Sequence, residues 1–491
     1  MFERIVAYQA GRVPDEAAIV LPHQSWSYGA FADLIDRFAG KLSDVIEPGR
    51  RILIDIPHLG AHWLVTLAVE KLGATSMALA GIPTTQAVLD QFGVDQVISD
   101  RPLGFAATKP STVIDDAWLQ EAKTETRTAP PRQRRPDDAV RIVVTSGTTG
   151  VNRMIMLDRA MLDLRINHSG VSQVFAKPKP RVISEIGPGS IGGFMLGLAA
   201  WMVGGALCQR DPAKTWAETL DTMEIDALIL APIQLKMALE SLPPGYKAPP
   251  GLALFVAGGS LSLPLMQATR ELLTDNIIVT YGATETGSVA IGHAEMLEGF
   301  EDGAGFIQPW AEVEILDADG NLLPPGAVGE VRVRGDEVVD GYFDGPGDPE
   351  RASFKDGWFY PRDLGTVTPA GLLKVLGRLD DLLNLGGDKI LPSRFEQAAL
   401  SVTGVRDAAA FSIPNELGLE VPWLAYVRKG KLDVAVLQAR LQMSLKWAVQ
   451  LMEVPEIPRN ALGKIVRGPL REAATNRQQE LKRSPKPHDQ E

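Results

Sequence analysis

The sequence predicts an α/β protein with a large N-terminal domain and a smaller α+β unit behind it. Up to Val279, short apolar runs alternate with helix-like segments, which is typical of parallel sheets wound with helices. From Val313 to Val375 the chain becomes β-rich, with Gly, Pro and Asp turns between the strands. A charged and more mixed segment follows Gly377. We therefore expect two domains, at residues 1–378 and 379–491.

The first strands and helices can be located one by one. Residues 51–56 are typical of a strand, a helical stretch runs through Leu72, and residues 97–99 form the next strand. A proline-rich polar linker covers Thr128 to Asp138. After it, the β-branched run from Ala139 to Val144 predicts a short buried strand. Further strands are expected at residues 182–183, 227–230, 254–256 and 277–279.

The longest uncharged apolar run, Ile191 to Cys208, reaches the lower length limit of a membrane span. Its glycines, above all Gly204 and Gly205, divide it into a helix-like piece and a strand-like piece. We therefore interpret the run as a buried helix and strand, and expect no stable membrane insertion. At the end of the chain, the polar tail from Arg477 to Glu491 is expected to fray.

Composition limits the classes of function. The chain has 491 residues, 45% of them hydrophobic and 22% charged, which is typical of a globular protein too long for one core. Its net charge of −12 argues against nucleic acid as a partner. The one cysteine, Cys208, excludes an internal disulfide and a cysteine-built metal site. With no secretory signal at the N-terminus, a cytoplasmic location is expected.

A hydroxyl-rich glycine loop follows the strand that ends at Val144. It consists of Thr145, Ser146, Gly147, Thr148, Thr149 and Gly150. Backbone N–H groups freed by glycine, together with four side-chain hydroxyls, can donate to several phosphate oxygens at once. The loop is not a Walker A motif, because Asn152 and Arg153 stand where that motif needs glycine and lysine. It favours nucleotide binding outside the P-loop class, and an ordinary turn is the alternative.

A second glycine motif indicates a different function. Residues 187–192 fit the pattern G-x-G-x-x-G, between a strand-like and a helix-like segment, and Asp211 lies about twenty residues further on, as in dinucleotide-binding folds. Against this interpretation, Pro188 stiffens the turn that would approach a pyrophosphate. A nicotinamide-dependent oxidoreductase that uses Gly187, Gly189 and Gly192 therefore stays as an alternative function.

A third motif, Tyr281 to Thr286, places an aromatic ring, a hydroxyl and a carboxylate within one turn. The ring can stack on adenine, and the carboxylate of Glu285 can hold Mg²⁺ that bridges ATP phosphates. Together with the hydroxyl-rich loop, this motif resembles the adenylate-forming superfamily. That superfamily comprises acyl-CoA synthetases, peptide-synthetase adenylation domains and luciferases.

The resemblance extends through further motifs in the order of the family, between Val140 and Arg471. These are an adenine-binding strand end at Gly258, Gly259 and Ser260, barrel motifs at residues 329–335 and 341–342, a ribose-binding segment at 357–365, a hinge at 377–381 and a catalytic-lysine motif at 458–465. The resemblance implies a large domain of doubly wound, mostly parallel sheets with a β-barrel-like subdomain. It also implies a small mobile α+β domain at the C-terminal end.

The family pattern implies ATP and Mg²⁺ as cofactors and a role for each matching residue in the first half-reaction. Lys464 neutralises charge as a carboxylate attacks the α-phosphate of ATP. Glu285 holds Mg²⁺, with Thr284 as a second catalytic residue. Asp363 accepts the ribose hydroxyls and Arg378 assists at the ribose or phosphate. The hydroxyl-rich loop and Arg153 bind the phosphates, and Gly258, Gly259, Ser260, Tyr281 and Gly282 complete the nucleotide site.

In the second half-reaction of the family, a thiol attacks the acyl-adenylate. Asp380 matches the hinge about which the small domain moves, and Gly386 and Gly387 would line the tunnel for a pantetheine thiol. The acceptor is either coenzyme A or the phosphopantetheine of a carrier protein, since both present the same thiol.

Departures from the family pattern bear on the substrate. Arg153 keeps the charge of the usual lysine but has a planar fork. Ser190 stands where many acyl-CoA synthetases carry a histidine or aromatic gate, and with Gly192 and Gly193 it is assigned to the acid pocket. No acidic residue occurs from Ile186 to Arg210, so a substrate ammonium would stay unpaired. An aryl or fatty acid is therefore favoured over an amino acid.

A catalytically inactive binding protein of the same fold is the third alternative. The replacement of the usual proline and lysine by Asn152 and Arg153 suggests it. The presence of Lys464, Glu285 and Asp363 argues for an active acid–thiol ligase instead.

Overall fold

The computed structural model describes residues 2–79, 81–129, 132, 135–146, 152–168, 177–297, 299, 303–343, 353–385, 388–415, 417–445, 447–459 and 463–483. These residues belong to two compact units. The first unit comprises Met1–Glu314, Arg332–Pro361 and Val367–Lys374, and the second comprises Ile315–Val331, Arg362–Thr366 and Val375–Glu491. The predicted domain limits at residues 378 and 379 stay a prediction beside this division.

The first unit contains a six-stranded sheet in the order β6-β5-β3-β4-β7-β8. All neighbouring pairs are parallel except β7 and β8, which are antiparallel. The strands are β3 (Arg51–Asp55), β4 (Thr75–Ala78), β5 (Gln96–Ser99), β6 (Ser111–Val113), β7 (Ala139–Ser146) and β8 (Asn152–Asp158). The hydroxyl-rich loop therefore joins two antiparallel neighbours, in whose register Thr145 faces Arg153.

A second sheet of this unit has a parallel centre in the order β13-β12-β11-β9-β10-β1, with antiparallel β14 and β2 as neighbours at its two sides. These strands are β1 (Ala17–Val20), β2 (Ser25–Ser27), β9 (Arg181–Ser184), β10 (Ala206–Cys208), β11 (Ala227–Leu230), β12 (Ala253–Val256), β13 (Ile277–Ala283) and β14 (Gly287–His293). The antiparallel pairing continues from β14 to β15 (Gly303–Ile307) and from β15 to β21 (Leu372–Arg378).

The β-rich region predicted from Val313 to Val375 is confirmed. Besides β21, it holds β16 (Ala311–Leu316), β17 (Gly329–Gly335), β18 (Phe354–Lys355), β19 (Trp358–Phe359) and β20 (Asp363–Val367). In the first unit, β17 pairs with β19 through Val333 and Phe359. In the second unit, the start of β17 pairs with β20.

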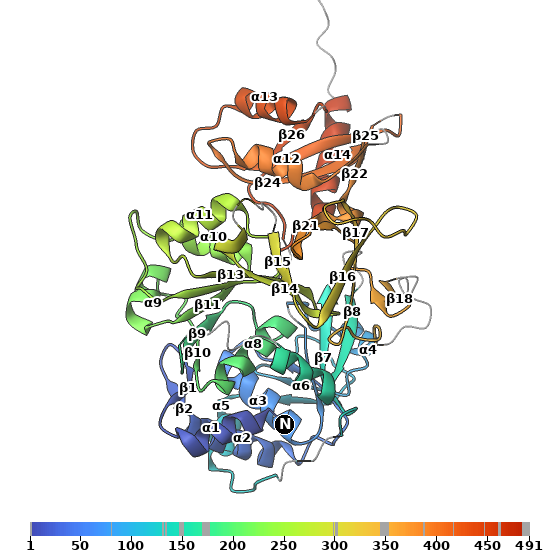
Figure 1. Cartoon of the computed structure of the whole chain (residues 1–491). Coiled ribbons are helices and arrows are strands. Elements are labelled where there is room, and N and C mark those ends of the chain that lie inside the picture. The colour runs from blue at the N-terminus through green and yellow to red at the C-terminus, as the bar shows by residue number, and fades with distance from the viewer. Residues whose placement is uncertain are drawn as a thin grey trace, which may run out of the picture. The chain divides into compact units, whose positions relative to one another are not determined.

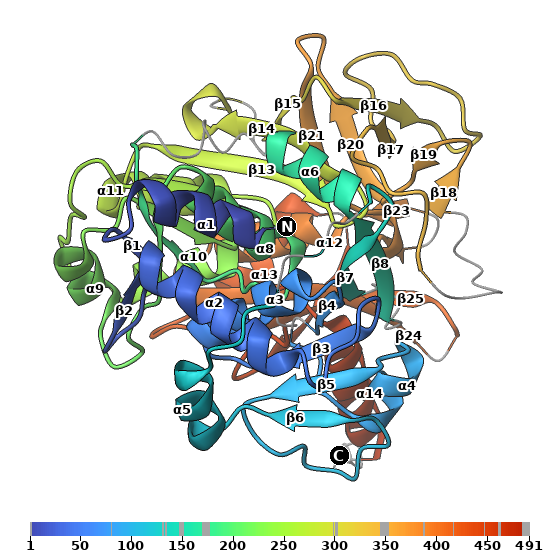
Figure 2. The same ribbon diagram turned by 90° about the horizontal axis from the view of Figure 1, so that it is seen from below.

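The helices of the first unit cover the faces of its sheets (Figures 1 and 2). They are α1 (Glu3–Arg12), α2 (Tyr28–Leu42), α3 (Leu59–Lys71), α4 (Gln86–Gln91), α5 (Asp116–Thr124), α6 (Arg159–His168), α8 (Ile191–Met202), α9 (Trp216–Met223), α10 (Pro232–Glu240) and α11 (Leu263–Leu272). Helices α3 and α8, which follow strands of different sheets, meet through Trp63 and Phe194, whose stacked rings lie 5.4 Å apart. Gly197 permits this approach, because a Cβ there would lie 2.5 Å from the Trp63 ring.

The apolar run from Ile191 to Cys208 divides as predicted. Helix α8 ends at Met202, Gly204 turns the chain with a φ of +76°, and β10 starts at Ala206. No helix among the described residues is long and apolar enough to cross a membrane. Cys208 is buried, and its burial raises the pKa of the thiol to about 11. The cysteine is therefore part of the core, as expected.

The second unit has a three-stranded sheet, in the order β24 (Val405–Pro414), β25 (Glu420–Arg428) and β26 (Gln450–Glu453), beside the hairpin of β22 (Leu383–Leu385) and β23 (Asp388–Ile390). Helices α12 (Pro392–Leu400) and α13 (Val434–Ser444) pack on one face of the sheet through Phe395 and Leu437 (Figure 1). Helix α14 (Arg467–Arg483) packs on the opposite face through Leu470 and Ala474.

Helix α14 corrects one expectation. The polar tail was expected to fray from Arg477, but the helix continues to Arg483. Leu470 and Ala474 anchor the helix in the core, and Gln, Glu, Leu and Lys then extend it because they are good helix formers. The rest of the predicted tail lies outside the described residues. The α/β fold class with a small C-terminal α+β unit is confirmed.

Candidate active site

Three residues of the first unit come together beside the end of β7. Glu285 lies on the turn between β13 and β14 and is 8% exposed. The Tyr342 hydroxyl donates a hydrogen bond to Glu285 Oε1 at 2.9 Å. The Arg153 guanidinium lies over the Tyr342 ring, 4.7 Å from its centre. Tyr342 therefore connects an acidic and a basic residue that the sequence had assigned separately to Mg²⁺ and phosphate.

The sequence predicts Tyr342 as part of a barrel motif and not as a site residue. The contact that places it is an antiparallel bridge between Phe343 and Met154, with the Phe343 N–H donating to the Met154 carbonyl at 2.8 Å. This bridge holds the segment around Tyr342 against β8, on which Arg153 lies. A pairing between residues so far apart in the chain leaves no local sequence signal, apart from the aromatic residue in the motif itself.

The turn that carries Glu285 is tight because its glycines allow it. The register of β13 and β14 shifts between Tyr281 and Gly282, where a Cβ on Gly282 would lie 2.1 Å from the Gly287 carbonyl oxygen. Gly287 has a φ of +64°, in the left-handed region that favours glycine. The Ala283 N–H donates to Thr286 Oγ1 at 3.0 Å and closes the turn. Thr284 and Glu285 thus lie at its tip.

The residues assigned to the nucleotide lie on neighbouring strands of the larger sheet. Gly258, Gly259 and Ser260 follow β12 after one intervening residue, and Tyr281 and Gly282 lie near the end of β13. The two strands are parallel, with Val256 opposite Val279, so both groups reach the same carboxyl edge of the sheet. Ligands of open α/β sheets bind at this edge. Gly258 has a φ of +83° and no atom within 4 Å of where a Cβ would stand.

The residues assigned to the acid pocket form the start of α8. Ser190 Oγ accepts a hydrogen bond from the Gly193 N–H at 3.1 Å and donates one to the Gly187 carbonyl at 3.0 Å. Ser190 is thus the N-cap of the helix. A Cβ on Gly193 would lie 2.2 Å from the Gly187 carbonyl oxygen, whereas one on Gly192 would only touch Ile186. Their role in binding an acid stays a prediction.

In the second unit, Asp363 and Asp380 lie around two arginines. Arg378 Nη1 lies 4.0 Å from Asp363 Oδ1, and its Nη2 lies 3.7 Å from Asp380 Oδ2. Arg362 Nη2 lies 3.2 Å from Asp380 Oδ1, and its Nη1 lies 2.9 Å from Glu330 Oε1. The predicted ribose aspartate, its assisting arginine and the predicted hinge residue therefore form one charge network.

Lys464 lies on a turn of the second unit, and its side chain is exposed. A bridge pairs Arg459 with Ile465, and the Val466 N–H donates to the Pro458 carbonyl at 2.8 Å. Arg459 donates to the Gly463 carbonyl at 2.9 Å and pairs with Asp407 at 2.9 Å. These contacts anchor Gly463 and Ile465, the two neighbours of Lys464 in the chain.

Some predicted site residues lie outside the described residues. They are Gly147, Thr148, Thr149 and Gly150 of the hydroxyl-rich loop, and Gly386 and Gly387 of the predicted tunnel. The backbone of Thr145 and Ser146 belongs to β7, but their side chains also lie outside the described part.

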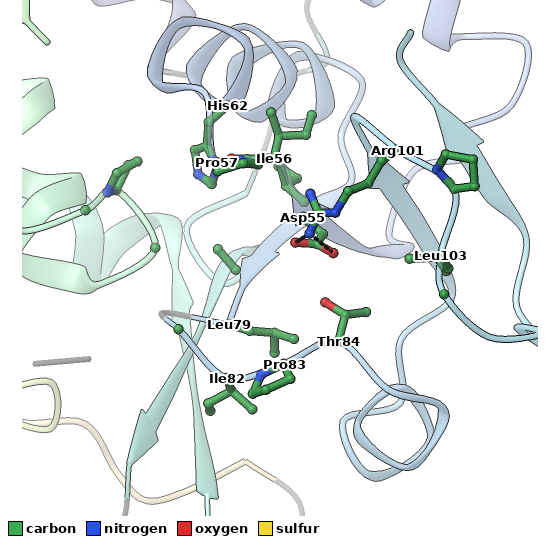
Figure 3. A pocket seen from close by; sticks show the side chains of 18 of the residues that line it. Asp55, Ile56, Pro57, His62, Leu79, Ile82, Pro83, Thr84, Arg101 and Leu103 are labelled. Atoms are coloured by element: carbon green, nitrogen blue, oxygen red, sulfur yellow. Dashed lines mark hydrogen bonds and ion pairs between the residues drawn. The ribbon is translucent and has the colours of Figure 1, made fainter. Parts of the chain in front are cut away.

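The six-stranded sheet carries a pocket of about 560 Å³ at the carboxyl ends of β3, β4 and β5 (Figure 3). Asp55 and Arg101 form an ion pair on its wall, with Arg101 Nη2 3.4 Å from Asp55 Oδ1. Proline and aliphatic side chains make up most of the other walls, and Gly187 to Gly189 close one side. The pocket thus extends to the loop directly before Ser190.

A family model for "AMP-binding enzyme" matches residues 6–343. The chain belongs to the AMP-binding enzyme family. This membership confirms the resemblance to the adenylate-forming superfamily. It lends no support to the oxidoreductase alternative, in which Gly187 to Gly192 would bind a dinucleotide.

Two curated relatives of this AMP-binding enzyme match nearly its whole length. An indoleacetate–CoA ligase of Aromatoleum aromaticum is 26% identical, over 94% of this chain and 96% of the relative. A fatty acid–[acyl-carrier-protein] ligase, MmaC, of Mycobacterium marinum is 27% identical, over 96% and 97%. The crystal structure of ATP-bound MatB from Rhodopseudomonas palustris has a TM-score of 0.85 at 21% identity, covering 97% of this chain and 99% of MatB, and so shares the fold.

The residues of the first unit fit Mg²⁺ and nucleotide phosphates. The Tyr342 hydroxyl engages Glu285 through one of its two carboxylate oxygens, and Arg153 supplies a cation 4.7 Å from the Tyr342 ring. Among the described residues, no group of three or more His, Cys, Asp or Glu side chains is placed to hold a metal. One carboxylate suits Mg²⁺, which binds through one or two carboxylates plus substrate phosphates.

Proposed function

We propose that this AMP-binding enzyme activates a carboxylic acid with ATP and transfers the acyl group to a pantetheine thiol. The first half-reaction forms an acyl-adenylate and releases pyrophosphate, and the second forms a thioester and releases AMP. The observation that carries the proposal is the contact of Glu285, Tyr342 and Arg153 beside the end of β7. This contact brings together a carboxylate suited to Mg²⁺ and a cation suited to phosphate, at the place where the hydroxyl-rich loop begins.

Several residues of the chain have separate roles in adenylation. Bound at Glu285, Mg²⁺ would neutralise charge on the ATP phosphates. Tyr342 orients the Glu285 carboxylate, and Arg153 supplies a guanidinium for the pyrophosphate. Asp363 would accept the ribose hydroxyls while Arg378 holds its carboxylate. Lys464 would neutralise charge as the acid attacks the α-phosphate.

An apolar aryl or fatty acid is the proposed substrate. The start of α8 carries glycine, isoleucine and phenylalanine, and the acid that precedes it in the sequence, Glu185, lies 3.7 Å from Arg210. Because no acidic residue occurs from Ile186 to Arg210, an ammonium group would find no carboxylate in this segment, and leaving it unpaired would be unfavourable. The names of the relatives include indoleacetate and fatty acid ligases, which agrees with this class.

The pocket in front of Gly187 to Gly189 offers room for the thiol acceptor. Its proline and aliphatic walls suit the pantetheine arm, and Arg101 offers a cation for a phosphate at the far end of the arm. Both coenzyme A and a carrier protein present such an arm. With one cysteine, which is buried, the enzyme is suited to a reducing cytoplasm.

Carboxylate-dependent exchange of pyrophosphate into ATP tests the proposal. The assay uses a panel of aryl, fatty and amino acids with Mg²⁺ present and no thiol. We expect exchange with aryl or fatty acids and none with amino acids. If ATP binds but no acid supports exchange, the result would support the inactive binding protein. If NADH binds and ATP does not, the result would support the oxidoreductase.

A further inference from the structure

A polar cluster with a buried arginine and a buried carboxylate lies next to the turn that carries Thr284 and Glu285. Its members are Arg165 and His168, near the end of α6, and Glu337, two residues after β17. Arg165 and Glu337 are each 3% exposed. Burying a guanidinium and a carboxylate this deeply is unfavourable unless both are well hydrogen-bonded. The function proposed above assigns no role to any of the three.

Arg165 joins the turn to the segment after β17. Its Nη1 donates to the Thr284 carbonyl at 3.0 Å, and its Nη2 donates to the Glu337 carbonyl at 2.6 Å. Because the guanidinium is planar and rigid, these two bonds hold the two carbonyls at a set distance. Burial lowers the pKa of Arg165 to about 10, so the side chain stays charged at neutral pH.

Glu337 supports the other end of the turn. Its Oε2 accepts a hydrogen bond from the Ser288 N–H at 3.1 Å, and its Oε1 lies 3.1 Å from His168 Nδ1. The His168 ring stacks on Trp310 at 4.6 Å, and Trp310 Nε1 donates to the Ser288 carbonyl at 2.9 Å. Ser288 is therefore held through both its N–H and its carbonyl.

These contacts leave Glu285 little freedom. The Val339 N–H donates to the Glu285 carbonyl at 2.9 Å, and Arg165 holds the preceding carbonyl, that of Thr284. The Tyr342 hydroxyl holds the carboxylate. The segment from Glu337 to Tyr342 thus contacts Glu285 at both its backbone and its side chain. Arg165 links this segment to the Thr284–Glu285 turn.

We propose that Arg165 and Glu337 are positioning residues that preset the Thr284–Glu285 turn and so determine how strongly Mg²⁺ strengthens ATP binding. The proposal rests on the proposed function, because it takes Glu285 as the Mg²⁺ ligand. A ligand oxygen that is already in place loses little freedom when the ion binds. Removing residues that orient a metal ligand typically lowers metal affinity by about 10- to 100-fold.

The test compares the dissociation constant of ATP with Mg²⁺ and with a chelator, by calorimetry and without an acid substrate. In Arg165→Met, we expect the strengthening by Mg²⁺ to fall by about 10-fold or more, with ATP binding under chelator little changed. Arg165→Lys keeps the charge but cannot hold two carbonyls in a fixed plane, so its loss should be substantial too. Glu337→Gln should lose less, since its amide oxygen can still accept from Ser288.

Tyr28→Phe is the matched control, because it removes another buried bond to a backbone carbonyl, from the Tyr28 hydroxyl to Gly205 at 2.6 Å. It should lower the melting temperature and leave the Mg²⁺ effect unchanged. A wild-type Mg²⁺ effect in folded Arg165→Met would overturn the inference. If Arg165→Met does not fold, Arg165→Lys decides, and a full wild-type effect there would also overturn it.

The two proposals fail differently in this experiment. If Mg²⁺ does not strengthen ATP binding to the wild-type protein, the proposed function fails. If it does, and the Arg165 variants behave like Tyr28→Phe, only the positioning role fails.

Discussion

Tyr342 and Glu285 illustrate how one hydroxyl orients a carboxylate. Burial and the neighbouring Glu285 raise the pKa of Tyr342 well above its usual range, while Arg153 opposes the rise through its charge and a hydrogen bond. The hydroxyl therefore stays protonated at neutral pH and donates to Glu285. Donor and acceptor keep fixed roles, so the carboxylate has a defined direction.

Lys464 is expected to act in the first half-reaction alone. Lys464→Ala should slow adenylation by about 100-fold or more, because a cation that offsets charge in the transition state is lost. Thioester formation from supplied acyl-adenylate should stay near the wild-type rate. Lys431→Ala, which changes another exposed lysine of the second unit, should affect neither step. An equal loss of both half-reactions in Lys464→Ala would contradict the assignment.

His62 is expected to make the first unit less stable in acid. Burial, with a contribution from the charge of Arg141, lowers the pKa of His62 to about 3 in the folded protein. Unfolded histidine has a pKa of about 6.5, so between these values the unfolded state binds a proton that the folded state does not. The free energy of unfolding should therefore fall with pH by about 1.4 kcal/mol per unit below about pH 6.

Denaturant unfolding at pH 7 and pH 5 measures this effect. The difference between the two pH values should be about 2 kcal/mol smaller in His62→Gln than in the wild-type protein. The exposed His23 gives the control, since His23→Gln should keep the wild-type difference. An identical pH dependence in all three proteins would show that His62 is protonated normally in the fold.

At the scale of elements, the turn between β13 and β14 depends on Gly287. A Cβ on Gly287 would lie 1.8 Å from Glu337 Oε2, in addition to the strain of its left-handed backbone. Gly287→Ala should therefore destabilise the protein by about 3 kcal/mol or more, and should weaken the Mg²⁺ effect on ATP binding. Thermal unfolding and ATP titration measure the two results.

Gly245 provides the comparison for this prediction. It has a φ of +75°, but no atom lies within 4 Å of where a Cβ would stand. Gly245→Ala should cost about 1 kcal/mol, for the backbone alone. If the two variants lose equal stability, the close packing of Gly287 on Glu337 has no energetic importance.

The pocket formed by β3, β4 and β5 is expected to serve the thiol and not the ATP. Arg101→Ala should raise the KM for coenzyme A several-fold, because a charge-assisted contact to phosphate is lost. Exchange of pyrophosphate into ATP should be unchanged. Arg50→Ala, which alters another exposed arginine of the first unit, should leave both properties unchanged. A drop in exchange in Arg101→Ala would instead connect the pocket with adenylation.

At the scale of the whole molecule, the two half-reactions are expected to need backbone freedom at Asp380. Proline there restricts φ, so Asp380→Pro should retain one half-reaction and slow the other by about 10-fold or more. Asp380→Ala removes the contacts with Arg362 and Arg378 but leaves the backbone free. It should therefore slow neither step to that extent. Rapid-quench measurement of each half-reaction compares the two variants, and equal behaviour would contradict a hinge.

The order of strands and helices was predictable because it follows from local patterns of apolar and turn residues. The strands at Ala227–Leu230 and Arg51–Asp55 are short apolar runs between turn residues, and they formed where they were expected. The split of the apolar run at Gly204 and Gly205 followed from the same rules. The length of α14 did not, because the anchoring of Leu470 and Ala474 depends on a face that only the folded sheet provides.

The sequence by itself determined the family and the α/β fold class, and it predicts Glu285, Asp363 and Lys464 as site residues, since each lies in a short motif whose spacing is local. Tertiary structure alone decided that Tyr342 contacts Glu285 and that Arg165 contacts Thr284 and Glu337. These partners are separated by 57, 119 and 172 positions. The sequence does not distinguish a buried arginine from an exposed one. The structural role of Arg165 depends on which carbonyls the fold brings within hydrogen-bonding distance of its planar guanidinium.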